Sequence, residues 1–387
     1  MPIKDRGLGS DTLARIIDSH WDSLQRDCNG YELRILHAIR RCRTPSLGGH
    51  QYECDRCKKK HFRYNSCRNR HCPQCQNTDK ERWVMARSEQ LIQVPYYHIV
   101  FTLPHTLNEL CLRYRQQIYS MMFRISWQTL DEFGWNKKYL GAQIGVTMVL
   151  HSWGSNMSFH PHIHCIVPGG GVSLSGKWKA AKGKGKFLFP VKAMSKVYRV
   201  KSVEYLKKFL VGKEVDNTES LCKQLYAKPW VVYAKPPFGG SQAVIKYLAR
   251  YTHKTAITHH RIKAWNKEEV TIRYTDYRHA SQKKEMTLST KEFLRRYKQH
   301  FLPKGFPRIR HYGILSSAWK KRIFPNAKTK KTDWQSLWVA KGVIIDQCPY
   351  CKVGKLIYVK EIKPVRGPPP AYNNRHTKTQ KDETLHS

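Results

Sequence analysis

The chain has 387 residues, and its 70 lysines and arginines outnumber its 28 aspartates and glutamates, which gives a formal net charge of +42 at pH 7. Apolar residues make up 40% of the sequence, which excludes a solvated, disordered polymer and predicts globular domains. Because so large an excess of positive charge repels itself in a folded protein unless a polyanion is near, we expect nucleic acid as the partner.

The sequence also indicates a compartment. It contains no run of eighteen apolar residues, and its first residues lack the apolar core of a secretory signal, so we expect a cytoplasmic protein with no membrane partner. Seven of its twelve cysteines lie between Cys28 and Cys75. In a reducing compartment, closely spaced cysteines indicate metal binding and not disulfides.

The first 95 residues divide into helices and a metal-organised segment. Apolar residues at helical spacing predict helices over residues 11–41, with a break at Asn29–Gly30. A short, polar segment rich in Cys and His follows over residues 42–77, and a capping pattern at Thr78–Glu81 predicts a helix over residues 78–93.

Two CxxC pairs predict a structural zinc site in this segment. A CxxC turn brings two thiolates to one metal ion, and two such turns complete a tetrahedron, so we predict one Zn²⁺ bound by Cys54, Cys57, Cys72 and Cys75. Four interleaved residues are candidates for a second zinc site: Cys42, His50, Cys67 and His71. We expect Arg68 and Arg70, beside these ligands, to contact the phosphates of DNA. The pair Cys348 and Cys351 has no obvious partner pair. It is either half of a zinc ribbon completed by distant residues or two buried thiols, and we do not expect metal there.

The chain changes character after Tyr96. Residues 98–103 and 143–151 have strand character and flank a long helical stretch, and a polar turn then leads to the segment HPHIHCIVPGGG, which begins at His160. We predict a hairpin between residues 143–151 and 159–168. Because alternate residues of a strand face one side, His160, His162 and His164 project together, and Ile163 faces a core.

These histidines predict a second kind of metal site. Two neutral imidazoles on one face of a strand, about 7 Å apart at Cα, can hold one divalent cation. We expect His162 and His164 as ligands, with either His151 or His160 as the third. The HExxH motif is absent, and the nearest acidic residues in the sequence are Glu132 and Glu204, so the attacking group has to be a side chain other than a nearby carboxylate.

A tyrosine pair is the candidate nucleophile. Tyr247 and Tyr251 are four residues apart, so they share a face if the segment is helical. Three cations surround them and are candidates for DNA binding: Lys246, Arg250 and Lys254. An ordinary amphipathic helix with two packed aromatics has the same spacing, but a metal that polarises a phosphodiester makes a phenolate useful as a nucleophile.

The rest of the chain predicts few further sites. Residues 176–186 form a basic, glycine-rich loop, and the G-x-x-x-x-G-K pattern that ends at Lys177 is a hairpin turn and not a phosphate-binding loop, because Trp178 replaces the required Ser or Thr. We expect a helix over residues 201–210, a hairpin over 261–278, a helix over 290–301 and a disordered tail beyond Lys360.

Together these features resemble the HUH rolling-circle transposases, and in particular the two-tyrosine group of the insertion-sequence ninety-one family, which is related to the Helitrons. The His162–Ile163–His164 and Tyr247-x-x-x-Tyr251 motifs and the cysteine-rich N-terminal segment carry the resemblance. Further similar stretches occur in the family's order over roughly residues 10 to 320: CRTPSLGGHQYECDRC, SCRNRHCPQCQ, YYHIVFTLPHTL, HPHIHCIVPGGG, YLARYTHKTAI and IRHYGILSSAWK.

The resemblance implies a fold and a reaction. The fold is α+β: a central antiparallel sheet flanked by helices, with the histidine pair on a central strand. His162 and His164 would hold Mg²⁺ or Mn²⁺ against a phosphate of single-stranded DNA. One tyrosine would attack to give a 5′-phosphotyrosine and a free 3′-hydroxyl, and the second would allow strand transfer. The resemblance also implies that the protein acts in the bacterial cytoplasm and nucleoid. Its partners would be the single-stranded and duplex DNA of the element ends and target, together with host replication and helicase machinery.

Three other functions explain part of the sequence. A zinc-ribbon DNA-binding protein without catalysis leaves the histidines unexplained, and a metallohydrolase leaves the charge unexplained. A plasmid replication initiator or relaxase would share the chemistry. We divide the chain into six parts: N-terminal helices (1–41), a zinc module (42–77), a connecting helix (78–95), the catalytic domain (96–260), a basic region (261–345), and the second CxxC pair with the tail (346–387).

Overall fold

The computed structural model describes residues 9, 11–76, 92–181, 188–235, 254–277, 279–319, 339, 342 and 344–365. Contacts divide the chain into two compact units. The first comprises Met1–Lys4 and Gln76–Thr332, and the second comprises Asp5–Cys75 and Asp333–Ser387. None of the described helices combines the length and the apolar composition that crossing a membrane requires.

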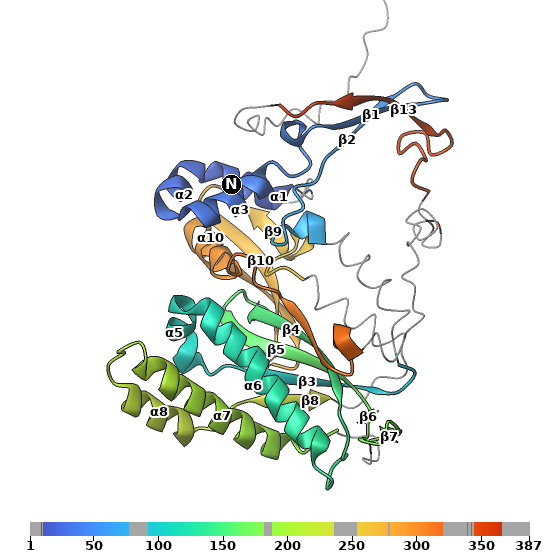
Figure 1. The fold of residues 1–387 in the computed structure, drawn as a ribbon. Coiled ribbons are helices and arrows are strands. Elements are labelled where there is room, and N and C mark those ends of the chain that lie inside the picture. Colours follow the sequence, from blue (N-terminus) through green and yellow to red (C-terminus); the bar gives the residue numbers. More distant parts are fainter. Residues whose placement is uncertain are drawn as a thin grey trace, which may run out of the picture. The chain divides into compact units, whose positions relative to one another are not determined.

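The first unit is built on a five-stranded antiparallel sheet with the order β12-β4-β5-β3-β8 (Figure 1). Its strands are β3 (Tyr96–Thr102), β4 (Gly145–Trp153), β5 (Phe159–Pro168), β8 (Val232–Lys235) and β12 (Ile309–Gly313). Strands β4 and β5 form the predicted hairpin, with Met148 opposite Cys165 and His151 opposite His162. The histidine-bearing strand β5 therefore lies at the centre of the sheet, as the resemblance implied.

Helices cover one face of this sheet (Figure 1). They are α5 (Asn108–Arg113), α6 (Arg115–Trp135), α7 (Val191–Val211) and α8 (Thr218–Ala227). The side chains of Ile163, Cys165 and Val167 enter the core beneath these helices, so the alternate residues His162 and His164 face the other side. The prediction of a polar face and an apolar face on this strand is confirmed.

A smaller three-stranded sheet and a helix also belong to the first unit. The sheet has the order β11-β10-β9, with β9 (Ile262–Trp265), β10 (Glu269–Asp276) and β11 (Gln282–Ser289), followed by α10 (Thr290–Gln299). The hairpin predicted for residues 261–278 and the helix predicted for 290–301 are both confirmed. The boundary predicted at residues 260 and 261 is not a division between units, because both sheets belong to the first one.

The described part of the second unit contains three α-helices near its N-terminus and a three-stranded sheet. The helices are α1 (Thr12–Ser19), α2 (Trp21–Asp27) and α3 (Gly30–Arg40), and the strands β1 (Gly49–Cys54), β2 (Lys60–Tyr64) and β13 (Leu356–Ile362) have the order β13-β1-β2. The predicted break at Asn29 is the start of α3, where the Asn29 side chain accepts hydrogen bonds from the amides of Tyr31 and Glu32.

Strand β13 corrects two predictions. Residues 42–77 and 346–387 were expected to be separate parts, but β13 pairs with β1 along its whole length. The tail was expected to be disordered beyond Lys360, whereas this strand continues to Ile362. The predicted fold class, α+β, is confirmed, since the protein contains the cysteine-rich N-terminal segment and an antiparallel sheet with helices. The helix predicted over residues 78–93 falls almost wholly outside the described residues.

Candidate functional site

Three histidines meet on the open face of the large sheet. One ring nitrogen each of His151, His162 and His164 lies within 4.8 Å of the others. The strand register explains the grouping, since His151 lies directly opposite His162 on the neighbouring strand. Of the two candidates for a third ligand, the structure thus brings His151 to the pair. His160 lies instead beside His105, with 5.1 Å between the ring centroids.

A hydrogen bond orients the ring of His162 toward His164. The Nδ1 of His162 donates to the carbonyl of His160 at 2.7 Å, which leaves its Nε2 as a lone-pair donor. That Nε2 lies 3.1 Å from the Nε2 of His164. Two nitrogens each bound about 2.1 Å from one ion at a right angle would be about 3 Å apart. The donor set therefore fits one divalent cation.

A fourth histidine, His98 on β3, lies behind the cluster. Its Nε2 is 2.8 Å from the Nδ1 of His164, so it can accept the proton that His164 carries when its Nε2 binds a metal. His98 was not among the residues predicted from the sequence. Its position depends on the pairing of β3 with β5, which places Val100 opposite His164, and only the alternation within the segment YYHIVF hinted at it.

Burial keeps this cluster neutral. Desolvation, with smaller contributions from Lys235 and His162, lowers the pKa of His98 to about 3. Desolvation also lowers the pKa of His162 to about 4, and that of His164 well below its ordinary value, with His151 as the next cause. Neutral imidazole is the form that binds a metal ion, so these residues are ready to act as ligands at pH 7.

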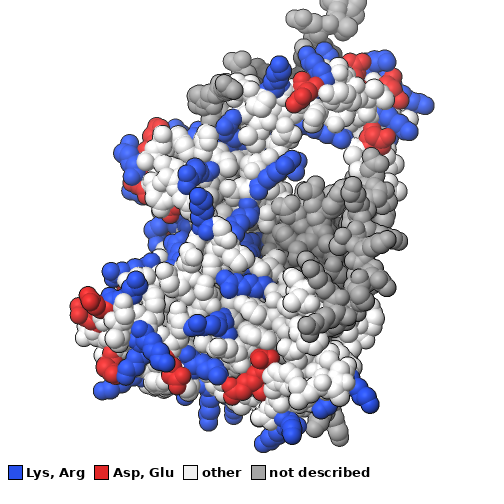
Figure 2. Space-filling model, viewed as in Figure 1, with Lys and Arg blue, Asp and Glu red and all other residues white. Residues whose placement is uncertain are grey.

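The histidines line a cavity of about 690 Å³. Its described lining contains no carboxylate residue, and it contains five basic ones: Lys235, Lys254, Arg261, Arg273 and Lys283. On the face shown in Figure 2, the blue lysine and arginine side chains are spread more widely than the red aspartate and glutamate side chains. A cavity that combines a cation site with this charge suits a phosphodiester.

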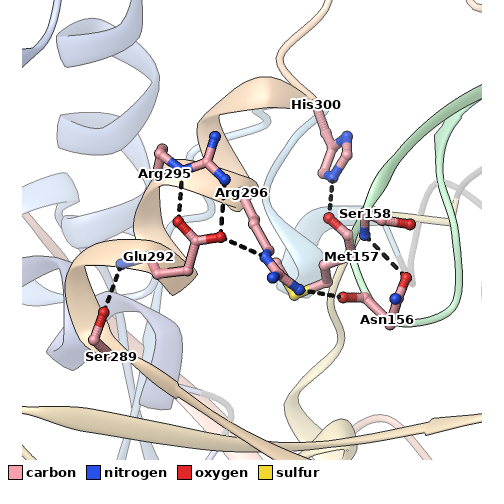
Figure 3. A network of polar contacts seen from close by, with 8 residues as sticks. All are labelled: Asn156, Met157, Ser158, Ser289, Glu292, Arg295, Arg296 and His300. Carbon is pink, nitrogen blue, oxygen red and sulfur yellow. Dashed lines mark hydrogen bonds and ion pairs between the residues drawn. The ribbon is translucent and has the colours of Figure 1, made fainter. Parts of the chain in front are cut away.

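The turn between the two histidine strands is held from outside the sheet (Figure 3). Arg296 on α10 donates to the carbonyl of Asn156 at 3.2 Å, and the Nε2 of His300 donates to the carbonyl of Met157 at 3.1 Å. Glu292 fixes Arg296 through a 2.7 Å ion pair. Arg261 donates to the carbonyl of Ser155. The segment after residue 260 therefore helps to position the histidine hairpin.

The cysteines form two four-residue clusters. Their members are Cys42, Cys67, Cys72 and Cys75 in one and Cys54, Cys57, Cys348 and Cys351 in the other. This corrects the predicted grouping, because Cys54 and Cys57 pair with the distant CxxC and not with Cys72 and Cys75. It also corrects the expectation of no metal at Cys348 and Cys351, which complete a four-cysteine cluster. Neither His50 nor His71 joins a cluster. Sequence proximity misled the assignment, since β13 returns to β1 from the far end of the chain.

The geometry of both clusters fits zinc. The Sγ atoms are 3.7 Å apart between Cys54 and Cys351 and also between Cys57 and Cys348. In the first cluster, the Sγ of Cys42 lies 3.6 Å from that of Cys75. A tetrahedron with Zn–S bonds of about 2.3 Å has edges of about 3.8 Å.

Backbone amides add to this fit. The amide of Gly354 points at the sulfur of Cys351 from 3.3 Å. Such amide contacts lower the pKa of Cys351 to about 6, and the thiolate is the form that ligates. The backbone is thus already arranged for metal-bound sulfur.

The predicted DNA-binding arginines of the second unit line a cavity of their own. Arg68 and Arg70 border a cavity of about 340 Å³ together with Arg34 and Tyr31 from α3, and His71 lies in its wall. The sequence analysis did not single out Arg34. Three guanidinium groups around one cavity suit phosphate groups.

The tyrosine pair is not described. Tyr247 and Tyr251, with Lys246 and Arg250, lie outside the described residues, so their roles stay predictions. Lys254 is described and lines the cavity with the histidines. Partial desolvation and nearby Arg261 lower its pKa.

The pattern that imitates a phosphate-binding loop is confirmed as a turn. Strands β6 (Gly170–Val172) and β7 (Trp178–Ala180) pair across it. The amide of Ser173 donates to the carbonyl of Lys177 at 2.9 Å.

Comparisons with known proteins agree on the family. A family model described as a putative transposase matches residues 145–322, and one described as a transposase zinc-binding domain matches residues 16–103. The chain is 36% identical over 363 residues to "Putative transposase y4qJ" of Sinorhizobium fredii, with 87% of this chain and 91% of that protein covered. The chain belongs to the insertion-sequence ninety-one family of transposases.

A second relative supports this. The transposase is 26% identical over 304 residues to "Transposase for insertion sequence element IS801" of Pseudomonas savastanoi pv. phaseolicola, with 74% of this chain and 70% of that protein covered. No solved structure matches this chain. The putative-transposase match runs from β4 through β12 and so includes both histidine strands and α10. The zinc-binding match and the cysteine clusters support structural Zn²⁺.

Proposed function

We propose that this transposase nicks and rejoins single-stranded DNA at the ends of its element through a 5′-phosphotyrosine intermediate. The observation that supports this most directly is the cluster of His151, His162 and His164 in a cavity lined by five cationic side chains. A site that only bound DNA would need the cations but not three imidazoles whose ring nitrogens lie within 4.8 Å of one another.

The three imidazoles would hold a divalent cation, Mg²⁺ or Mn²⁺ by the family resemblance. When bound, such an ion supplies Lewis-acid polarisation of a phosphate oxygen. Three nitrogen ligands favour Mn²⁺ over Mg²⁺, which prefers oxygen ligands. His98 would act as a positioning residue, because its hydrogen bond fixes the ring of His164. Lys254 would place positive charge beside the phosphate.

One of Tyr247 and Tyr251 would supply the nucleophile. Its phenol loses its proton, and the oxygen forms a bond to phosphorus while the bond to the 3′-oxygen breaks. The leaving oxygen takes up a proton to become the 3′-hydroxyl. The phosphodiester is exchanged and not hydrolysed, so rejoining requires no ATP. Lys246 and Arg250, close in sequence, would favour the phenolate. Strand opening would come from host replication and helicase machinery.

The second unit would bind the DNA of the element ends. Arg34, Arg68 and Arg70 surround one cavity, and the neighbouring four-cysteine cluster would hold the loop that carries two of them. Contacts of this type fix the position of a protein on DNA. Zinc would then act in folding and not in the reaction, because four cysteines fill the coordination of each ion.

Incubation with short labelled single-stranded oligonucleotides and Mn²⁺, followed by a denaturing gel, tests the proposal. We expect a protein–DNA adduct that survives denaturation in the wild type and is lost in His162→Ala. His311→Ala is the matched control, because His311 lies in the same sheet on β12, where its Nδ1 is 3.0 Å from the Oγ of Thr147, outside the histidine cluster. Adduct formation that is equal in His162→Ala and the wild type would contradict the metal site.

Two alternatives give different results in the same assay. A zinc-ribbon protein that only binds DNA gives no adduct with any oligonucleotide, although it shifts them on a native gel. A plasmid replication initiator or relaxase gives the adduct but acts on a replication or transfer origin and not on element ends. The family membership favours the transposase over both.

A further inference from the structure

The β10–β11 hairpin lines one side of the histidine cavity. Arg273, Tyr277 and Lys283 of this hairpin line the same cavity as His162 and His164. The hairpin belongs to the segment that the sequence analysis treated only as a basic region. Its side chains combine two chemistries, since Arg273 and Lys283 are cationic and Tyr277 is aromatic.

The aromatic side chain is unusually open. Tyr277 is 74% exposed, although it lies in the wall of a cavity and burial of its aromatic ring would be energetically favourable. Tyr233 on β8 lines the same cavity and is 51% exposed. Exposed rings next to cations are the arrangement on which unpaired bases stack while the backbone phosphates are neutralised.

The hairpin is held in a fixed relation to the metal ligands. The Nε of Arg261 donates to the carbonyl of Arg273 at 3.0 Å, and its guanidinium also reaches the carbonyl of Ser155 in the β4–β5 turn. The hydroxyl of Ser155 in turn donates to the carbonyl of Thr275. One turn therefore connects the strands that carry His151 and His162 to the strand that carries Arg273.

The acidic groups of the hairpin do not cancel its charge in the cavity. Asp276 pairs with Lys284 and His279, each at 2.8 Å. Glu285 lies 3.6 Å from Arg273, but both side chains are exposed, and such pairs contribute little. Neither carboxylate lines the cavity. A phosphate can thus compete for Arg273, and Lys283 is available beside it.

We propose that Arg273, Tyr277 and Lys283 form a strand clamp for single-stranded DNA. Tyr277 stacks on an unpaired base, and the two cations hold the phosphates next to the one that enters the histidine cluster. The clamp rests on the proposed function for the identity of its substrate. Because stacked neighbours cover the faces of the bases inside a duplex, the clamp selects single-stranded over duplex DNA.

Fluorescence anisotropy with labelled oligo-dT and with a duplex of equal length, without added Mn²⁺, tests the clamp. Base stacking contributes about 1–3 kcal/mol per base, so we expect Tyr277→Ala to weaken oligo-dT binding about 5- to 150-fold and to leave duplex binding unchanged. Tyr277→Phe keeps the ring and should bind like the wild type. Tyr226→Ala, which removes a 41% exposed tyrosine of α8 outside the cavity, should also bind like the wild type.

A salt titration and a cross-link test the same surface. Lys283→Gln should lower the slope of log affinity against log salt by about 0.7, the value for one phosphate contact with a single strand. Oligo-dT that contains 5-iodouracil should cross-link to the peptide that carries Tyr277. The clamp is overturned if Tyr277→Ala binds oligo-dT like the wild type, or if it weakens duplex binding as much as oligo-dT binding. It is also overturned if no cross-link falls within residues 269–289.

These readouts separate the clamp from the proposed chemistry. If the clamp is right and the phosphotyrosine reaction is wrong, Tyr277→Ala weakens binding while the wild type forms no adduct with Mn²⁺. If the reaction is right and the clamp is wrong, the wild type forms the adduct and Tyr277→Ala binds normally.

Discussion

The double substitution Cys348→Ser and Cys351→Ser should remove one of two zinc ions and open the sheet β13-β1-β2. These cysteines complete a cluster with Cys54 and Cys57 although almost 300 residues separate the two pairs. Two remaining thiolates cannot hold a tetrahedral zinc ion in place. The other cluster, which includes Cys42, should keep its ion.

The structure explains why the loss should open the whole sheet. Among the described residues, the buried apolar cluster at this sheet comprises Cys54, Cys348 and Leu356, with partly buried Tyr52, Cys57 and Cys351 packed against it. Burial of a leucine contributes roughly 1.5–3 kcal/mol. Ordering the strands costs about 1–2 kcal/mol per residue, which net hydrogen bonds of about 0.5–1.5 kcal/mol each offset in part. A structural zinc ion contributes about 10–16 kcal/mol in small domains, so the metal decides whether this sheet forms.

Two measurements test this. Elemental analysis should give two zinc ions per chain in the wild type and one in the double variant. Hydrogen exchange should lose protection over residues 49–54 and 356–362. Cys28→Ser is the matched control, since Cys28 is partly exposed and belongs to neither cluster. Two retained zinc ions, or unchanged protection of these strands, would refute the reasoning.

Three further outcomes follow from the first unit. His98→Ala should weaken Mn²⁺ binding about 10- to 100-fold, because the partner of His164 is lost, and calorimetry that shows equal affinity would contradict its positioning role. Burial lowers the pKa of His300 to about 4, below about 6.5 in the unfolded chain. The stability from its neutral form is therefore present above pH 6.5 and falls by about 2 kcal/mol between pH 7 and 5, and denaturation of His300→Gln should show a weaker fall. Gly313→Ala should destabilise the unit by roughly 3 kcal/mol or more, since φ is +57° and a Cβ would collide with the carbonyl of Ile144. Gly305→Ala, also at positive φ but with open space around it, should cost only about 1–2 kcal/mol, and equal thermal shifts would argue against the collision.

Local periodicity was sufficient for the elements that carry the histidines. The alternation HPHIHC fixes which side chains share a face whatever the partner strand is, so the polar face of β5 and its hairpin with β4 followed from the sequence. The third position was open between His151 and His160, because both are close to the pair in sequence. Cross-strand register groups His151 with the pair, and register depends on where the turn begins.

Long-range pairing was beyond the sequence. The choice of zinc partners depends on β13 returning to β1, and no local pattern encodes a contact between Cys57 and Cys348. His98 was missed for the same reason, since it reaches His164 diagonally across β3 and β5. Arg34 was not predicted, because α3 and the segment that carries Arg68 line a common cavity only in the folded protein.

The central claim is that a tyrosine of this chain becomes joined to DNA beside the histidine cluster. Peptide mass spectrometry of the adduct formed with single-stranded DNA and Mn²⁺ tests it most directly. We predict a nucleotide attached through its 5′-phosphate to Tyr247 or Tyr251, and none in His162→Ala. An attachment to Tyr277 or to any other residue, or a cleaved strand with no attached peptide, would contradict the claim.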